Sequence, residues 1–321
     1  MKKEFIYAAV AVLALSGCSK NDVEPVVVTD SELLSFTVGV DPVQTKSMLE
    51  YDEGKVEDVQ VFVFNHQGYL EAYYHGQSLT AEFKCTEGEK RVYAMVNADD
   101  HSTVSLVTEI SDMVSNIYND NDVSRFLMTG QTTMTVSKSN SVNKCSVEVS
   151  RLVSKVTLGT VTLDFQAEHY AQRRFTIDAV YLLNIPQNTN CFLEPSPGVT
   201  SYYNLTRLVS PGSESALFCD VLSSSAVVTE ATPYKAVHNF YTYPNLGTTY
   251  TKLVVESTID GKRCYYPVEI PSIGRNKVYT VNLLIRRPGS SQPNEPVSTY
   301  DANSGITVAE WGESILVEKE L

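Results

Sequence analysis

The sequence lacks the motifs that identify most enzymes and cofactor-binding proteins. It contains no GxSxG, HExxH, P-loop or GxGxxG pattern. Its five histidines stand alone, without a pair at metal-ligand spacing. We therefore expect no enzymatic activity, no cofactor and no metal centre.

Basic residues are in the minority and form no patch. The 321 residues include 25 Lys and Arg against 38 Asp and Glu, which gives a formal net charge of −13. A nucleic-acid interface needs clustered positive charge, so no nucleic-acid partner is expected. The acidity also argues against electrostatic binding to an anionic membrane, and it helps to keep a surface protein soluble.

Cysteines are few and form no CxxC pairs. Five follow Cys18, namely Cys85, Cys145, Cys191, Cys219 and Cys264. An odd number cannot pair completely within one chain, and the spacings do not suit zinc. Buried thiols are expected, and one disulfide stays open as an alternative in an oxidising compartment.

Long apolar runs are absent except near residue 1. Two lysines precede an apolar run over residues 5–15, which is too short to span a membrane. The small residues before Cys18 are typical of a bacterial lipoprotein cleavage box, in which the cysteine is acylated and the signal is cut before it. Several acyl chains anchor a protein stably. Residues 1–17 are therefore predicted to be a lipoprotein signal peptide, with an ordinary signal peptide as the alternative.

Alternating apolar and polar residues fill much of the remaining chain, as in half-buried β-strands. In LLSFTVGV the apolar positions are Leu34, Phe36, Val38 and Val40. Similar patterns occur in VEDVQVFVF, KRVYAMVNA, RFTIDAVYLL and YTKLVVESTIDGKRCYYPVEI. The Asp260-Gly261 pair in the last of these suits a type I′ hairpin turn. Many short strands predict an all-β fold of β-sandwich domains.

One short helix is expected among these strands. Apolar residues recur at helical spacing at Val104, Val107, Ile110, Val114 and Ile117. Ser102 or Thr103 could cap this helix. The length of the chain suggests two domains, and we place their junction near residue 150.

The segment YNDNDVS brings two carboxylates close together, at Asp120 and Asp122. It lacks the glycine and the distal glutamate of a hand-type calcium loop. We therefore expect a solvated turn here.

Tyrosine is abundant, at 19 residues, often in neighbouring pairs. Tyrosines suit both strand faces and contact surfaces, because each combines apolar area with one polar tip. Packing within the sheets is the favoured interpretation, and a glycan-binding platform is the alternative.

The C-terminal stretch ITVAEWGESILVEKEL continues the strand pattern. Ile306 and Val308 indicate one strand, and Ile315, Val317 and Leu321 continue an alternation. Such an end either pairs within the chain or is offered to a neighbour, because an unpaired strand edge is a template for another chain.

The ordered set of motifs resembles the fimbrillin family, the fimbrial subunits of Bacteroides-type bacteria. After the cleavage box come VEDVQVFVFNHQGYL, RVYAMVNAD, FLMTGQ, VSRLVSKVTL, IPSIGRNKVYTVNLLI and ITVAEWGES. The resemblance covers essentially the whole chain. It implies two transthyretin-like β-sandwich domains in tandem, carried to the outer membrane as a lipoprotein. It also implies that a trypsin-like surface protease removes the lipidated segment with its first strand, and that another subunit's strand fills the vacated groove.

Carried onto this chain, the resemblance makes Cys18 the lipidated residue. The removable strand would present Leu34, Phe36, Val38 and Val40, and the donor strand would present Ile315, Val317 and Leu321. Cleavage is expected between Lys46 and Ser47, with Lys55 as the second candidate. Here the chain departs from the family, whose cut follows arginine, because its first arginine is Arg91.

The domain organisation follows from these assignments. Residues 18–46 would form the lipidated propeptide with the removable first strand. Residues 47–150 would form the N-terminal sandwich, and residues 151–321 the C-terminal sandwich with its donor tail at about 313–321.

The resemblance implies a structural subunit of a surface fimbrium, which polymerises after proteolysis and supports adhesion. The expected partners are copies of itself, other fimbrial subunits, the protease and a host or bacterial surface ligand. The chain would be an outer-membrane lipoprotein precursor whose mature form lies in the fimbrium on the cell surface. The alternatives are an anchor or tip subunit that keeps its lipid, and a surface glycan-binding lipoprotein.

Overall fold

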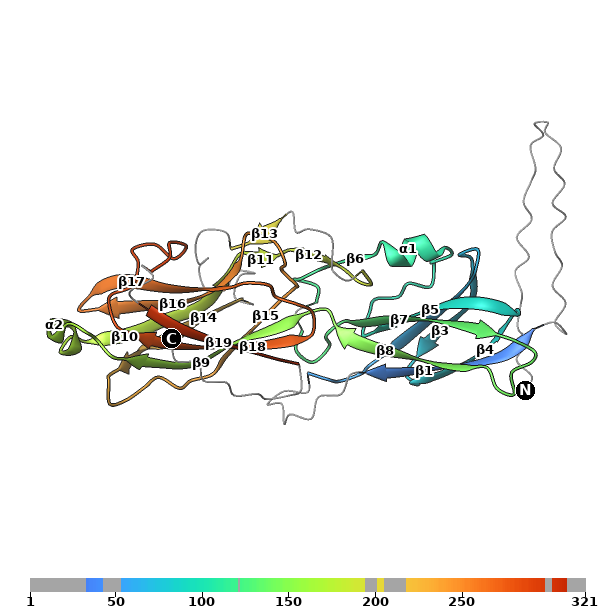
Figure 1. Ribbon diagram of the computed structural model, residues 1–321, viewed down its shortest axis with the longest axis horizontal. Helices are drawn as coiled ribbons and strands as arrows, with labels where there is room; N and C mark the ends of the chain where they lie inside the picture. Colours follow the sequence, from blue (N-terminus) through green and yellow to red (C-terminus); the bar gives the residue numbers. More distant parts are fainter. Residues whose placement is uncertain are drawn as a thin grey trace, which may run out of the picture.

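The computed structural model describes residues 33–42, 53–120, 122–193, 201–204, 218–297 and 302–310. The chain is elongated, and two β-rich lobes follow one another along its long axis (Figure 1). The predicted signal peptide, Cys18, the Lys46–Ser47 bond and the tail at 313–321 all lie outside the described residues. Within the described residues, no helix is long and apolar enough to cross a membrane.

A seven-stranded sheet forms the first lobe, in the order β3-β2-β5-β7-β8-β1-β4. Its strands are β1 (Leu34–Pro42), β2 (Val59–Asn65), β3 (Leu70–Gly76), β4 (Thr80–Cys85), β5 (Gly88–Val96), β7 (Met128–Val136) and β8 (Lys144–Arg151). One face of the sheet encloses an apolar core to which β1, β2, β4, β5, β7 and β8 all contribute. Strands β2 and β5 are also buried on their other face, where Phe62, Tyr93 and Met95 join a second core.

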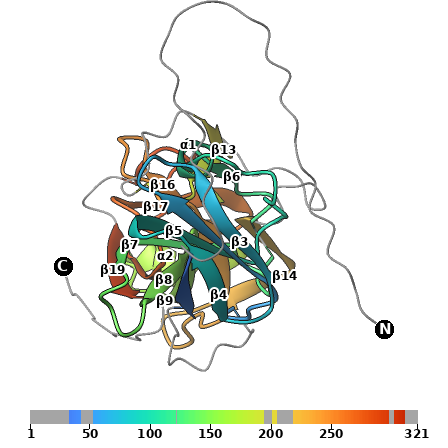
Figure 2. The ribbon, with the colours of Figure 1, turned by 90° about the vertical axis from the view of Figure 1, so that its right-hand side faces the viewer.

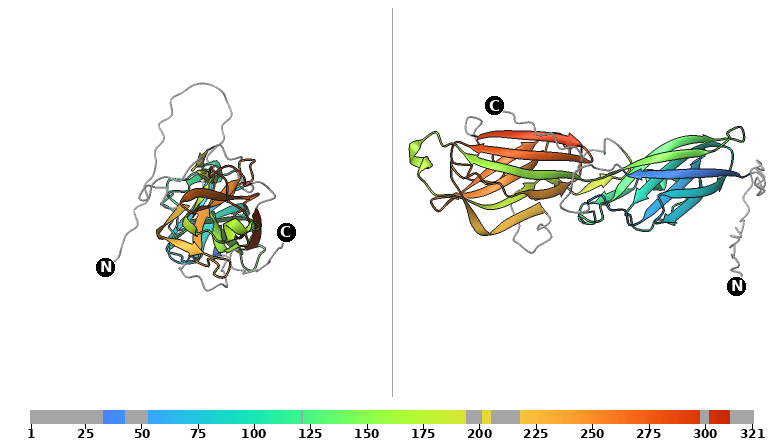
Figure 3. Two further views of the ribbon diagram at one scale, coloured as in Figure 1. Left: turned by 90° about the vertical axis from the view of Figure 1, so that its left-hand side faces the viewer. Right: turned by 90° about the horizontal axis from the view of Figure 1, so that it is seen from below.

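Two four-stranded sheets form the second lobe, in the orders β14-β10-β16-β17 and β15-β9-β18-β19. Their strands are β9 (Ser154–Leu163), β10 (Phe175–Leu183), β14 (Cys219–Val228), β15 (His238–Thr242), β16 (Thr251–Ile259), β17 (Lys262–Ile270), β18 (Lys277–Ile285) and β19 (Ala302–Glu310). The sheets form two layers over a shared apolar core (Figure 3). Since strands dominate throughout, the predicted all-β class is confirmed; the domain boundaries remain a prediction.

Short elements complete the fold. They are α1 (Val107–Ser111), β6 (Val114–Asn116), α2 (Glu168–Ala171), β11 (Ile185–Pro186), β12 (Asn188–Asn190) and β13 (Tyr202–Tyr203). Strands β6 and β12 pair antiparallel, so they join the segment before β7 to the second lobe. Helix α1 and strand β4 lie on opposite sides of the first lobe, which Figure 2 shows end-on.

The junction between the lobes is densely bonded. The Arg275 guanidinium donates to the backbone oxygens of Cys191, Thr129 and Ser150, at 3.0, 3.1 and 3.0 Å. The Phe126 and Tyr241 rings lie 4.8 Å apart between their centroids, and the Tyr93 and Phe192 rings 5.0 Å apart. Contacts of this kind hold the two lobes in one orientation.

The predicted helix is present but much shorter than expected. Helix α1 covers only Val107–Ser111, and its N-cap is Leu106 rather than Ser102 or Thr103. The Glu109 carboxylate accepts from the Leu106 backbone N–H at 2.9 Å, so Glu109 supplies the polar side-chain contact at the start of this helix. Val114 is exposed within β6, because pairing with β12 replaces the last helical turns that the spacing predicted.

Two other sequence features behave as predicted. Asp260 and Gly261 have φ of 47° and 81°, the positive values that a type I′ turn requires. Tyr181, Tyr243 and Tyr266 are fully buried, as packing within the sheets predicts. Tyr69, in contrast, is 59% exposed.

Candidate functional site: the groove around the first strand

Strand β1 lies inside the sheet of the first lobe, with a partner on each side. It runs antiparallel to β4, where Phe36 faces Phe83 and Val38 faces Ala81. It runs parallel to β8, where Val40 faces Val147. The strand that the sequence predicted is therefore confirmed, and it is an interior strand. Its removal would leave a groove between β4 and β8 with two open ladder edges.

The apolar side chains of β1 form part of the core of the first lobe. Phe36, Val38 and Val40 are 1%, 0% and 2% exposed, while Leu34 is half-buried at the start of the strand. They belong to the same apolar cluster as side chains from β2, β5 and β8, including Val61, Val92 and Val149. Burial of an aliphatic or aromatic side chain of this size contributes roughly 1.5–3 kcal/mol. The strand is therefore held mainly by its apolar face and its two ladders.

Polar contacts of β1 are few and lie at the surface. The Lys84 ammonium donates to Ser35 Oγ at 3.1 Å, and the Ser146 hydroxyl donates to the Asp41 carboxylate. Exposed contacts of this kind contribute little net stability. These polar contacts therefore add little to the attachment of β1, which depends on its apolar face and its two ladders.

Two thiols flank β1 on the core side of the sheet. Cys85 lies opposite Leu34 in the ladder with β4, and Cys145 lies opposite Val38 in the ladder with β8. Both thiols are free. Burial raises the pKa of each to about 11, and for Cys85 the nearby Lys90 ammonium opposes that effect while Glu71 adds to it. The reactive thiolate is therefore scarce while β1 is seated.

The C-terminal strand predicted at Ile306 and Val308 is present as β19. It pairs antiparallel with β18 and is the last strand of its sheet among the described residues. Ile306 is half-buried and packs on the core of the second lobe. This part of the C-terminal stretch is thus paired within the chain. The predicted donor residues Ile315, Val317 and Leu321 lie outside the described residues.

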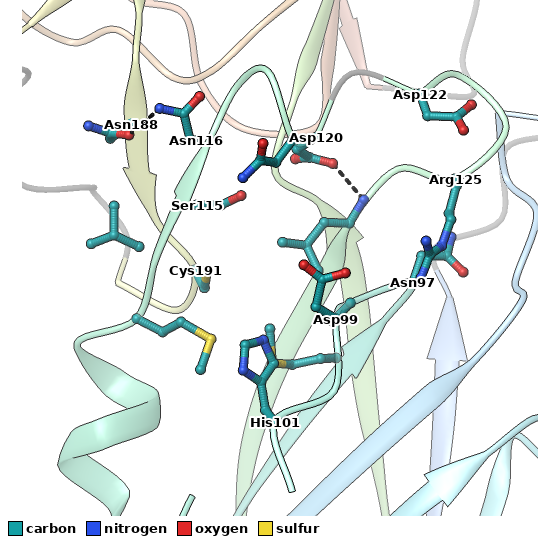
Figure 4. A pocket seen from close by; sticks show the side chains of 16 residues that line it. Asn97, Asp99, His101, Ser115, Asn116, Asp120, Asp122, Arg125, Asn188 and Cys191 are labelled. Carbon is teal, nitrogen blue, oxygen red and sulfur yellow. Dashed lines mark hydrogen bonds between the residues drawn. The ribbon is translucent and has the colours of Figure 1, made fainter. Parts of the chain in front are cut away.

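The structure also contains a cavity that the sequence did not reveal. It has a volume of about 340 Å³ and lies where the loop after β5 meets β6 and β12 (Figure 4).

Asp120 lines this cavity and is only 3% exposed, so the predicted solvated turn is wrong for this residue. Its Oδ1 accepts from the Leu127 backbone N–H at 2.7 Å. Burial raises the pKa of the Asp120 carboxyl to about 8, against the opposing effect of that hydrogen bond. Asp122 remains exposed, and the Ser124 hydroxyl and N–H lower its pKa.

A family model supports the resemblance that the motifs indicated. Residues 34–164 match the family described as major fimbrial subunit protein (FimA), and the match begins at the first residue of β1. No curated protein matches the sequence.

Solved structures share the fold over nearly the whole chain. A candidate cell adhesion protein from Bacteroides eggerthii has a TM-score of 0.69 at 20% identity, over 87% of this chain and 96% of that one. A fimbrilin (FimA) from Porphyromonas gingivalis has a TM-score of 0.62 at 14% identity, over 89% of this chain and 98% of that one. The tip fimbrial protein Mfa3 from P. gingivalis, with a C-terminal truncation, has a TM-score of 0.53 at 13% identity, over 87% and 100%. At these identities the likeness establishes the fold.

Proposed function

Because residues 34–164 match the major fimbrial subunit family, we propose that this chain is a structural subunit of a surface fimbrium that polymerises by strand exchange. One observation carries the proposal. Strand β1 fills an interior position in its sheet, yet it lies between the predicted lipidation site at Cys18 and the predicted cut at Lys46. A single cut would therefore separate a complete core strand from the rest of the chain.

Loss of β1 would leave the first lobe incomplete. Three fully buried side chains would be withdrawn, which removes on the order of 5–9 kcal/mol of apolar burial. That loss is comparable with the whole free energy of unfolding of a typical domain. Two ladder edges would also lose their partners, and open edges associate readily with other strands. The emptied groove therefore has a strong tendency to accept another strand.

The proposed donor has the pattern that the groove requires. Ile315, Val317 and Leu321 share one face of an extended strand, since their positions differ by even numbers. Backbone ladder bonds would supply affinity, and the alternating side-chain positions would fix the register. Donor and groove belong to opposite ends of the sequence, and β19, which precedes the donor, lies in the second lobe. A head-to-tail contact of this kind does not close on itself, so it extends into a filament.

The N-terminus of the surface protein tests this proposal directly. We expect mass spectrometry of sheared filaments to find chains that start at Ser47, without the acylated Cys18 peptide. A Lys46→Ala variant should yield the lipidated chain in membranes and few or no filaments. If the surface protein of the parent still begins at acylated Cys18 and never enters a filament, the proposal of a polymerising subunit fails. An anchor subunit or a monomeric binding lipoprotein would then replace it.

Thiol labelling should report whether β1 has left the groove. Cys85 is 1% exposed beside β1, so its reaction with a maleimide at pH 7 should be slow in the intact chain. After cleavage and release of β1, its burial is relieved and the thiol pKa should fall, so we expect labelling to accelerate at least tenfold. Quantitative peptide mass spectrometry would follow Cys85, with Cys264 in the second lobe as the internal control.

A synthetic peptide of residues 313–321 should then slow Cys85 labelling again, while a peptide with aspartate in place of Val317 should not. The groove hypothesis would be contradicted if the Cys85 rate stayed unchanged after release of β1, or if Cys264 accelerated equally.

A further inference from the structure

The cavity between the lobes is built from segments that are far apart in the sequence. The loop after β5 contributes Asp99 and His101, the segment around β6 contributes Asn116 and Asp120, and β12 contributes Asn188 (Figure 4). Its volume of about 340 Å³ lies at the lower end of small-molecule sites, which span roughly 300–1,000 Å³. The cavity thus suits a ligand of about one ring.

The wall of the cavity holds a buried carboxyl oxygen without a hydrogen-bond partner. Asp120 Oδ2 has no hydrogen-bond partner among the described residues, although Oδ1 of the same carboxyl binds the Leu127 N–H. The Tyr243 hydroxyl is close by, but it donates to Ser115 Oγ at 2.8 Å. A buried polar atom without a partner is costly, so it is a position at which a ligand hydroxyl gains affinity.

Other hydrogen-bonding groups line the same cavity, among them the exposed Asn188 amide as a donor and the exposed Asp99 carboxylate as an acceptor. Asn188 Oδ1 accepts from the Asn116 amide at 3.1 Å, which fixes the Asn188 side chain and leaves its own N–H₂ group with no partner among the described residues. The Asp99 carboxylate and the His101 ring likewise have no hydrogen bond or ion pair to another described side chain. The cavity therefore offers acceptors and donors together.

The polar groups of the cavity disfavour two classes of ligand. Its one arginine, Arg125, lies 3.6 Å from the Glu57 carboxylate and 3.4 Å from that of Asp58, so these carboxylates largely offset its charge and an anion gains little there. An ammonium group could satisfy the carboxyls, but it cannot accept a hydrogen bond from Asn188. A hydroxyl both donates and accepts, and the methionine and leucine side chains of the cavity offer apolar contact to C–H groups.

We infer that this cavity binds a neutral polyhydroxylated ligand, a single sugar residue either free or at the end of a glycan. In this arrangement the Asp120 carboxyl, which carries a proton, donates to one ligand hydroxyl, the Asp99 carboxylate accepts from another, and the Asn188 amide donates to a ligand oxygen. Because the cavity lies away from β1, the inference does not depend on strand exchange.

Methionine methyl groups provide a direct probe of binding. Met95 and Met113 line the cavity, whereas Met128 and Met134 belong to the core around β1. In the full chain labelled with ¹³C-methyl methionine, titration with methyl glycosides of neutral hexoses and of N-acetylhexosamines should shift the Met95 and Met113 signals saturably. The Met128 and Met134 signals should stay in place. An oligosaccharide with the same terminal residue would distinguish a glycan end from a free sugar, since only a glycan-end site binds it at least as tightly.

Two variants on different segments test the contacts. Asn188→Ala and Asp99→Asn should each weaken binding by about fivefold or more, as expected for one lost ligand hydrogen bond. Glu230→Gln changes an exposed acid on the second lobe in the same way as Asp99→Asn and should leave binding unchanged. The inference is overturned if no neutral sugar shifts Met95 and Met113, if only a cationic probe such as lysine amide does, or if neither variant weakens binding.

Discussion

A Val38→Asp chain should unfold with a free energy about 4 kcal/mol or more below that of the parent. Val38 is 0% exposed at the centre of β1, between Ala81 and Cys145 on the neighbouring strands. The substitution removes apolar burial and places a carboxyl where the described residues offer it no partner, and both changes are destabilising. Urea unfolding followed by circular dichroism at pH 7 would measure the difference.

Ser35→Asp is the matched control for this prediction. Ser35 lies on the same strand but is exposed, and the Lys84 ammonium lies 3.1 Å from its hydroxyl. We expect this variant to change the free energy of unfolding by less than about 1 kcal/mol, the usual limit for an exposed pair. Equal effects of the two substitutions would mean that β1 is not a core strand.

Substitution of Asp120 by asparagine should remove a pH dependence of the free energy of unfolding. Its pKa is raised to about 8, above the ordinary value, so the folded chain holds a proton on this carboxyl that the unfolded chain has lost. Between roughly pH 4 and 8 unfolding therefore releases a proton, and the free energy of unfolding falls as the pH rises. The slope from this group alone approaches about 1.4 kcal/mol per pH unit.

Asp120→Asn keeps a carbonyl oxygen for the Leu127 N–H but carries no titratable proton. Relative to the parent, this variant should gain about 2–3 kcal/mol between pH 5 and pH 7 in urea unfolding experiments. Asp122→Asn is the natural control, because that carboxyl is exposed and its pKa is lowered, so it stays ionised over this range. A parallel pH dependence of the parent and Asp120→Asn would contradict the assignment.

Local patterns predicted the strands well because the alternation that marks a strand involves only residues that are close together in the sequence. The alternation of Leu34, Phe36, Val38 and Val40 requires one buried face, and the structure buries three of these side chains fully. The Asp260-Gly261 turn follows from the positive φ that both positions must adopt. What the alternation could not show is that β1 has a partner on both edges, since pairing depends on β4 and β8 far along the chain.

The features that the sequence did not reveal depend on contacts between distant segments. Val114 has helical spacing to Ile110, yet β12 draws it into a two-stranded sheet from more than seventy residues away. Asp120 looks like a turn residue in YNDNDVS, but it is buried because the second lobe, through Tyr243 and Cys191, packs around it. The cavity could not be foreseen for the same reason, because no single stretch contains its lining.

The direction of β1 has a mechanical consequence. The strand runs along the long axis of the molecule, as two perpendicular views show (Figures 1 and 3). Tension along that axis therefore acts in shear on the ladders with β4 and β8, and the hydrogen bonds share the load instead of opening one by one. Any strand seated in this position, the chain's own or a neighbour's, is fastened in the orientation that best resists traction by flowing liquid.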